Sequence, residues 1–184
     1  KNLLHHSLLE QEGPEISVQS STLLQNYALK DYAVLGASNS GKTKELLQLF
    51  QLLYSQGHTA LFGISGEQPS PMETYTHQTT YLEIKKENAV AATVSVMAQA
   101  LLYDSLLALW QEKPINYQQL ADVVETALNR QFQQEVMDAL TNAQTIYWAG
   151  HDTGETEELA LKSIETIRKP SYYLPGTYLL HGIE

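Results

Sequence analysis

The chain has 184 residues, of which 43% are hydrophobic and 17% are charged, an ordinary composition for a globular protein with one sizeable core or two smaller ones. It contains no cysteine, which excludes a disulfide framework and thiolate chemistry and favours a cytoplasmic location. The formal net charge of −10 disfavours a broad nucleic-acid-binding surface. No apolar run approaches the length of a bilayer span, so we expect no membrane segment.

The chain begins at Lys1 without Met and stops abruptly at Glu184, so we expect it to be a fragment. His5 and His6 are adjacent and have no acidic or cysteine partner at ligand spacing, so we expect surface residues and no metal site. The first part of the chain predicts a short helix, a strand and a second short helix, over residues 3–12, 15–18 and 20–26.

A turn of small hydroxylated residues follows an apolar run at residues 32–36 and precedes a helical pattern that Gly57 ends. Ser38, Ser40 and Thr43 supply three hydroxyls where backbone N–H groups and the positive end of a helix dipole converge. The turn therefore predicts a phosphate site. The expected ligand of this turn is a small phosphorylated molecule rather than a nucleotide. The alternative is a polar helix cap, with Thr43 or Ser40 as the capping residue.

Further apolar runs predict strands at residues 59–64 and 79–84, followed by a long helix over residues 88–110. Strands separated by helices need parallel crossovers, so we expect an α/β fold, a three-layer sandwich with a parallel sheet covered on both faces. One or two connecting helices are expected next, and then a second strand-turn-helix unit. These later elements are expected at residues 117–143, 145–150 and 155–168.

Three ionisable residues of that last helix, Glu158, Lys162 and Glu165, recur at i, i+4 and i+7 and so share one side. A carboxylate beside an ammonium can be held ionised and ready to accept a proton. The alternative is a solvated face with ordinary ion pairs. The chain then returns as a strand and loop to His181, whose imidazole titrates near neutrality and suits proton transfer.

Three motifs, in order along the chain, resemble the sugar isomerase (SIS) domain family. Ser-Asn-Ser-Gly-Lys-Thr at residues 38–43 resembles its Ser-x-Ser-Gly-x-Thr phosphate loop, with Lys42 where many members have Glu. Glu-Asn-Ala-Val-Ala-Ala-Thr at residues 87–93 resembles its Glu-x-x-Val-Ala-Ser-Thr segment, with Ala92 in place of the usual Ser. Residues 158–165, followed by His-Gly, are similar to the second-domain motif of glucosamine-6-phosphate synthase and related deglycases.

The resemblance implies two flavodoxin-like SIS domains in tandem, incomplete in this chain, with a sugar phosphate at their interface. The first domain is expected over residues 1–132, without the family's first strand, and the start of the second over residues 133–184. A small-molecule sugar phosphate is the implied ligand, without a cofactor, a metal or a nucleic acid. A homodimer or higher homo-oligomer is expected, because in this family the His-Gly loop often serves the partner's site.

The resemblance also assigns roles to single residues. Glu165 would be the catalytic base, Lys162 would sit beside it, and His181 would assist ring opening or act as the acid. The implied activity is an aldose-ketose isomerase acting on a sugar phosphate. The alternatives are a deglycase that splits a fructosamine 6-phosphate into glucose 6-phosphate and an amine, and a non-catalytic sugar-phosphate sensor. The implied substrate-binding residues are Ser38, Asn39, Ser40 and Thr43 for the phosphate and Val90 for the sugar.

Overall fold

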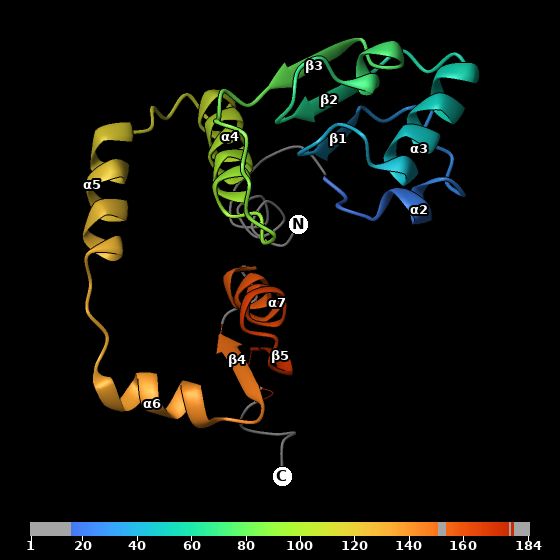
Figure 1. Ribbon diagram of the computed structural model, residues 1–184. Helices are drawn as coiled ribbons and strands as arrows, with labels where there is room; N and C mark the ends of the chain where they lie inside the picture. The colour runs from blue at the N-terminus through green and yellow to red at the C-terminus, as the bar shows by residue number, and fades with distance from the viewer. Residues whose placement is uncertain (1–15, 151–153, 177, 179–184) are drawn as a thin grey trace. The chain divides into compact units, whose positions relative to one another are not determined.

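The computed structural model describes residues 16–150, 154–176 and 178 (Figure 1). The chain divides into two compact units, and the described residues of the first are 16–100, while those from 101 onward belong to the second. Each unit is described by itself below. The domain boundary expected between residues 132 and 133 stays a prediction.

The first unit holds a parallel three-stranded sheet in the order β1-β2-β3 (Figure 1). The strands are β1 (Val34–Ser38), β2 (Leu61–Ser65) and β3 (Gln78–Tyr81). The register sets Ser38 opposite Ser65, so two serines end neighbouring strands at the carboxyl edge of the sheet. The α/β fold with parallel strands expected from the sequence is confirmed.

The core of the first unit forms where α3 (Lys44–Ser55) packs on the sheet. A Cβ atom on Gly36 would lie 2.6 Å from side-chain atoms of both Leu46 and Phe50, so glycine lets the helix approach β1 closely. Gly57 has a φ of +74°, as expected for the residue that ends this helix. The short helix α2 (Ser21–Leu24) packs beside α3. The buried residues of this core are Val34, Leu46, Leu49, Phe50, Leu53, Leu61 and Met72.

Two elements of the first unit differ from expectation. Residues 16–18, the described part of the strand expected at 15–18, form no strand, because this run offers only two apolar side chains, too few for a buried strand face. The long helix α4 starts at Val94 and ends at Trp110, so it begins six residues later than predicted. The 3₁₀ helix η1 (Pro71–Thr74) lies in the connection between β2 and β3.

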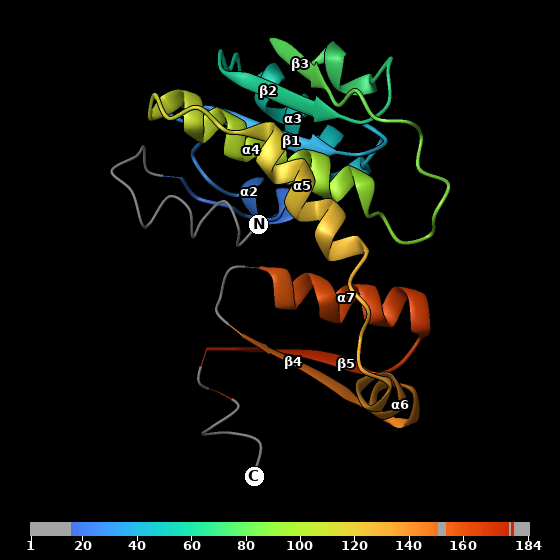
Figure 2. The same cartoon turned by 90° about the vertical axis from the view of Figure 1, so that its left-hand side faces the viewer.

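The second unit contains a parallel pair of strands, β4 (Ile146–Gly150) and β5 (Ser171–Pro175), joined through α7 (Glu155–Ile167). Helix α7 packs on this pair (Figure 2). Trp148 Nε1 donates a hydrogen bond to Ser163 Oγ at 3.1 Å and so joins β4 to α7. The strand and the helix of the predicted second strand-turn-helix unit are therefore present, and its turn at residues 151–153 lies outside the described residues.

The expected connecting segment consists of two helices, α5 (Tyr117–Leu128) and α6 (Gln134–Asn142). Lys169 Nζ donates to the carbonyl oxygens of Leu140, Thr141 and Ala143 at the C-terminal end of α6. This ammonium offsets the negative end of the helix dipole. Among the described residues, no helix has the length and apolar character needed to cross a membrane.

Candidate functional site

The loop after β1 gathers hydroxyl groups at the start of α3. The hydroxyl of Ser38, a buried residue, lies 2.7 Å from the hydroxyl of Thr43. Two backbone donors close the turn: Gly41 N–H binds the Ser38 carbonyl at 3.1 Å, and Lys42 N–H binds Ser40 Oγ at 3.2 Å. The structure therefore brings the predicted phosphate residues together in one tight turn at the carboxyl end of a parallel strand, where α/β proteins bind ligands.

Thr43 occupies the N-cap position of α3, but within the described part of the chain its side chain makes no capping hydrogen bond. Its hydroxyl pairs with Ser38 instead. The first N–H groups of an α-helix have no intrahelical acceptor, and the helix dipole is positive at this end. Thr43 therefore does not cap α3 through its side chain, and phosphate binding by the loop stays a prediction.

A second loop, which follows β2, supports the first. Gly41 has a φ of +64°, and a Cβ atom there would lie 2.0 Å from Ser70 Oγ and 2.8 Å from Ser65 Oγ. Both serines are buried, so only glycine fits against them. The Gly66 N–H donates to the Asn39 carbonyl at 2.9 Å. The backbone of the hydroxyl-rich loop is thus fixed by its neighbour.

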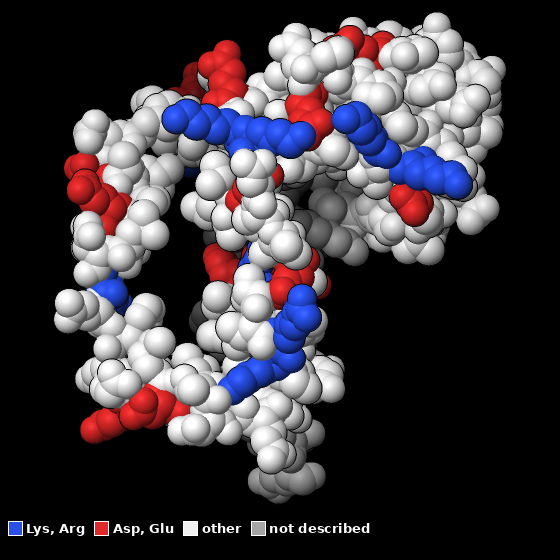
Figure 3. Space-filling view, viewed as in Figure 1, with Lys and Arg blue, Asp and Glu red and all other residues white. Residues whose placement is uncertain are grey.

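Three charged side chains form a cluster beside these loops. Lys42 Nζ lies 3.2 Å from Glu67 Oε2, and Lys86 Nζ lies 3.5 Å from Glu67 Oε1. The hydrogen bond and positive charge of Lys42, followed by the charge of Lys86, lower the pKa of Glu67. The cluster joins the segments that follow β1, β2 and β3. On the face drawn in Figure 3, basic side chains likewise lie beside acidic ones.

Glu87 caps α4 from outside the helix. Its Oε1 accepts hydrogen bonds from Thr93 N, Thr93 Oγ1 and Val94 N at 2.7, 2.6 and 2.9 Å, and its Oε2 accepts from Ser95 N and Oγ at 3.2 and 2.9 Å. These bonds, those of Thr93 above all, hold the pKa of Glu87 far below its ordinary value of 4.5. This cap explains why α4 starts at Val94. Sequence reasoning missed it, because capping residues usually stand next to the helix.

The segment closed by this cap carries Val90, the residue predicted to line the sugar. Val90 is 94% exposed, whereas the next residue, Ala91, is 5% exposed and packs into the protein. Glu87 and the buried Ala91 therefore hold a short loop that presents Val90 outward. Its role toward a sugar stays a prediction.

On α7, Lys162 lies between two carboxylates. Its Nζ is 2.9 Å from Glu165 Oε2 and 3.1 Å from Glu158 Oε1, and its side chain is 19% exposed. Burial on its own lowers the pKa of Lys162, but the neighbouring carboxylates of Glu165 and Glu158 outweigh it, so the pKa is raised. The ammonium is therefore charged at neutral pH. The structure brings together the three residues whose helical spacing predicted one shared face.

His181 lies outside the described residues, as do His5 and His6, and its role stays a prediction. Glu165 belongs to the second unit and the hydroxyl-rich loop to the first, so each half of the predicted site is described alone. The part of the chain that the structure describes contains no group of three or more His, Cys, Asp or Glu side chains able to hold a metal ion.

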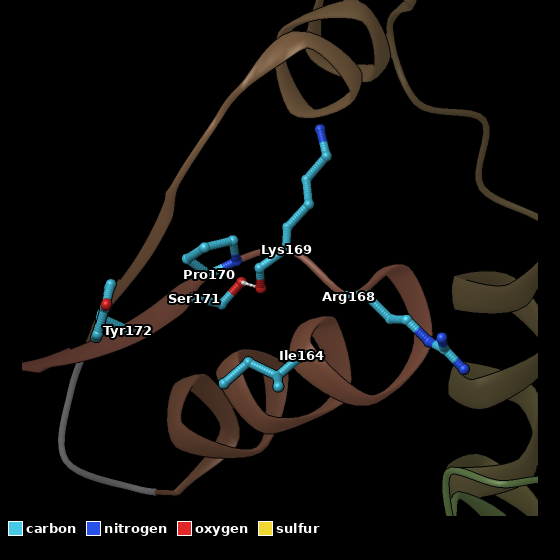
Figure 4. Close-up of a pocket in the computed structure, with 6 residues that line it drawn as sticks. All are labelled: Ile164, Arg168, Lys169, Pro170, Ser171 and Tyr172. Atoms are coloured by element: carbon cyan, nitrogen blue, oxygen red, sulfur yellow. Dashed lines mark hydrogen bonds between the residues drawn. The ribbon is translucent and has the colours of Figure 1, made fainter.

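A shallow pocket lies elsewhere in the second unit, at the connection between α7 and β5 (Figure 4). In this view Lys169 and Arg168 extend away from the other lining residues. The pocket is at the start of β5, whereas ligands of parallel sheets bind beyond the carboxyl ends of the strands. It is therefore not the candidate site. Its lining residues are Ile164, Arg168, Lys169, Pro170, Ser171 and Tyr172.

The structure shows an α/β protein with a parallel sheet and a hydroxyl-rich loop between a strand and a helix. The family is identified by comparing the sequence with models of known families. The SIS domain model matches residues 13–109, more than half of the chain, so the chain belongs to the SIS domain family. The resemblance stated from the three motifs is confirmed. No curated protein is significantly similar to the chain in sequence.

Several solved structures are similar to this chain in fold. One from Silicibacter pomeroyi DSS-3, named as a phosphosugar isomerase, has a TM-score of 0.80 at 21% identity, over 100% of this chain and 58% of that chain. The C-terminal domain of glucosamine-fructose-6-phosphate aminotransferase from Francisella tularensis has a TM-score of 0.62 at 21% identity, over 90% and 52%. Glucosamine-6-phosphate deaminase from Thermotoga maritima has a TM-score of 0.61 at 19% identity, over 80% and 47%. The chain thus spans about half the length of these structures.

Proposed function

We propose that this chain binds a sugar phosphate and belongs to an enzyme of the aldose-ketose isomerase type. The observation that carries the proposal is the loop after β1, where Ser38, Ser40 and Thr43 converge on the N-terminus of α3 without capping it. The names of the fold neighbours, phosphosugar isomerases and a deaminase of an amino sugar phosphate, support the same substrate class.

The phosphate accepts hydrogen bonds from hydroxyls and backbone N–H groups of this loop. Asn39 lies in the same turn and completes the predicted set of phosphate residues. Gly41 lets the loop keep this conformation, because a Cβ there would meet the side chains of Ser70 and Ser65. A phosphate monoester carries nearly two negative charges at neutral pH, so each N–H or O–H group that donates to it makes a charge-assisted bond.

For the chemical step we assign Glu165 as the general base. With the sugar ring open, Glu165 takes the proton from the carbon next to the carbonyl, and the electron pair moves onto the carbonyl oxygen to give an enediolate. Glu165 then returns the proton to the former carbonyl carbon while a proton passes from the neighbouring hydroxyl to the first oxygen, so the carbonyl moves between C1 and C2. Lys162 lies beside the base, with its Nζ 2.9 Å from Glu165 Oε2, and His181 assists ring opening.

A deglycase is the second candidate, favoured by the fold neighbour named as glucosamine-6-phosphate deaminase. The same Glu165 and His181 would act as base and acid while an amine leaves the sugar carbon, giving glucose 6-phosphate after hydrolysis. A sugar-phosphate sensor is the third. We also propose two tandem SIS domains with a boundary near residue 132, a homo-oligomer in which His181 serves the partner's site, and a cytoplasmic location.

One incubation series separates these candidates. The protein is mixed in turn with glucose 6-phosphate, fructose 6-phosphate and a fructoselysine-type 6-phosphate, and the products are resolved by chromatography. Interconversion of the two hexose phosphates supports the isomerase, and release of glucose 6-phosphate with free amine supports the deglycase. Binding without turnover supports the sensor. Neither turnover nor binding of any of the three compounds would contradict all three candidates.

A further inference from the structure

Lys42 is part of the hydroxyl-rich loop, yet its side chain points to a carboxylate. Its backbone N–H donates to Ser40 Oγ, and its Nζ lies 3.2 Å from Glu67 Oε2. Glu67 follows β2, which pairs in parallel with β1, so both residues lie at the carboxyl edge of the sheet. The positive charge is therefore within the predicted phosphate loop and is neutralised by a neighbouring loop.

The pair is exposed enough to exchange partners. The side chains of Lys42 and Glu67 are 61% and 31% exposed, and such ion pairs contribute little to stability because water screens them. A phosphate dianion held by several N–H and O–H donors is a stronger partner for an ammonium than one screened carboxylate. The free energy lost when Lys42 separates from Glu67 is thus smaller than the free energy gained when Lys42 binds an anion in the loop.

Lys86 makes this exchange favourable for Glu67 as well. Its Nζ contacts the other carboxylate oxygen, Oε1, at 3.5 Å, so Glu67 keeps a cation after Lys42 leaves. Glu67 therefore has an opposite charge beside it both in the free protein and after Lys42 has left.

We propose that Lys42 is a further phosphate ligand, held by Glu67 in the free protein and transferred to the phosphate dianion when a sugar phosphate binds. The inference rests on the proposed function and adds a specificity residue to the same site. Glu67 acts as a competitor for the ammonium, so it lowers the affinity of the loop for anions. The expected consequence is opposite effects of the two charge-removing substitutions.

The test is calorimetric titration of glucose 6-phosphate into four proteins, wild type, Lys42→Gln, Glu67→Gln and Lys44→Gln, with glucose titrated into wild type as the unphosphorylated comparison. Lys44 is the matched control, because it is an exposed lysine two residues away at the start of α3. Lys42→Gln should weaken binding about ten-fold or more, as expected for a lost charge-assisted bond. Glu67→Gln should tighten binding, and Lys44→Gln should change it by less than about two-fold, since exposed charges are screened.

Four outcomes are decisive. Tighter binding by Glu67→Gln together with weaker binding by Lys42→Gln supports the transfer. If both substitutions weaken binding, the ion pair merely holds the loop and the proposal is wrong. If Lys42→Gln matches Lys44→Gln while wild type still prefers glucose 6-phosphate to glucose, the inference fails and the proposed function stands. A wild-type protein without that preference overturns both.

Discussion

The carboxylate of Glu87 binds Thr93 twice, accepting from its backbone N–H at 2.7 Å and from its hydroxyl at 2.6 Å. These two bonds close residues 88–92 into a loop and set the first turn of α4. The loop carries the exposed Val90, which the family resemblance assigns to the sugar. A capping contact thereby determines the position of a predicted substrate-binding segment.

Glu87→Gln should loosen the start of α4. The amide keeps the size of the side chain but has one acceptor oxygen where the carboxylate has two, and it loses the charge that favours the helix N-terminus. Amide hydrogen exchange at Thr93, Val94 and Ser95 should become faster. Glu83→Gln, a change at an exposed residue four positions earlier, is the control, and equal exchange rates in the two variants would argue against the cap.

Low pH should remove the stabilisation that the Glu87 carboxylate gives to the wild-type protein. The pKa of Glu87 is lower in the folded chain than its ordinary value of 4.5, so the unfolded state binds the proton first. The stabilisation is fully present above pH 4.5 and is lost as the pH falls toward the lowered pKa. Urea unfolding at a series of pH values should show a steeper loss below pH 4.5 in wild type than in Glu87→Gln. Parallel curves for the two proteins would contradict this.

Gly41→Ala should disturb the hydroxyl-rich loop through a steric clash and through the strain of a positive φ. Gly57→Ala is the control that has the strain without the clash. Both glycines have positive φ, but a Cβ at Gly41 meets Ser70 Oγ at 2.0 Å, whereas at Gly57 no described heavy atom lies within 4 Å. Gly57→Ala should therefore cost only the strain of the left-handed conformation, about 1–2 kcal/mol. Gly41→Ala should destabilise the protein by more than this in urea unfolding, and equal losses would remove the steric argument.

Sequence patterns predicted the elements that depend on nearby residues. The run from β1 through the loop to α3 was predictable because apolar periodicity and Gly57 are local signals. The contact of Lys162 with Glu165 was predictable because helix geometry fixes where residues three positions apart lie.

Contacts that depend on how distant segments meet were not predictable. Lys42 and Glu67 are 25 positions apart, and their pairing requires the register of β1 against β2. The Glu87 cap requires the chain to fold back over six residues, so the helical pattern alone placed the start of α4 too early. Neither contact leaves a periodic signal in the sequence.

Glu165→Gln tests the proposed base. General base catalysis contributes about a hundred- to ten-thousand-fold to rate, so kcat should fall by that factor while binding of glucose 6-phosphate is retained. Glu158→Gln is the matched control on the same helix face, because it also removes a carboxylate from Lys162, and it should cost less. Steady-state kinetics on the isomerase or deglycase reaction provide the comparison. A Glu165→Gln protein with most of its kcat would rule out this assignment.

The central claim is that the loop from Ser38 to Thr43 binds the phosphate of a sugar phosphate. Calorimetric titration of glucose 6-phosphate into wild type, Ser38→Ala and Ser55→Ala tests it most directly, since Ser55 is a serine at the far end of α3. Loss of a hydroxyl donor to a charged acceptor costs about 1.5–3 kcal/mol, so Ser38→Ala should weaken binding about ten- to a hundred-fold. Ser55→Ala should bind as wild type does. Unaltered affinity in Ser38→Ala would show that the phosphate binds elsewhere.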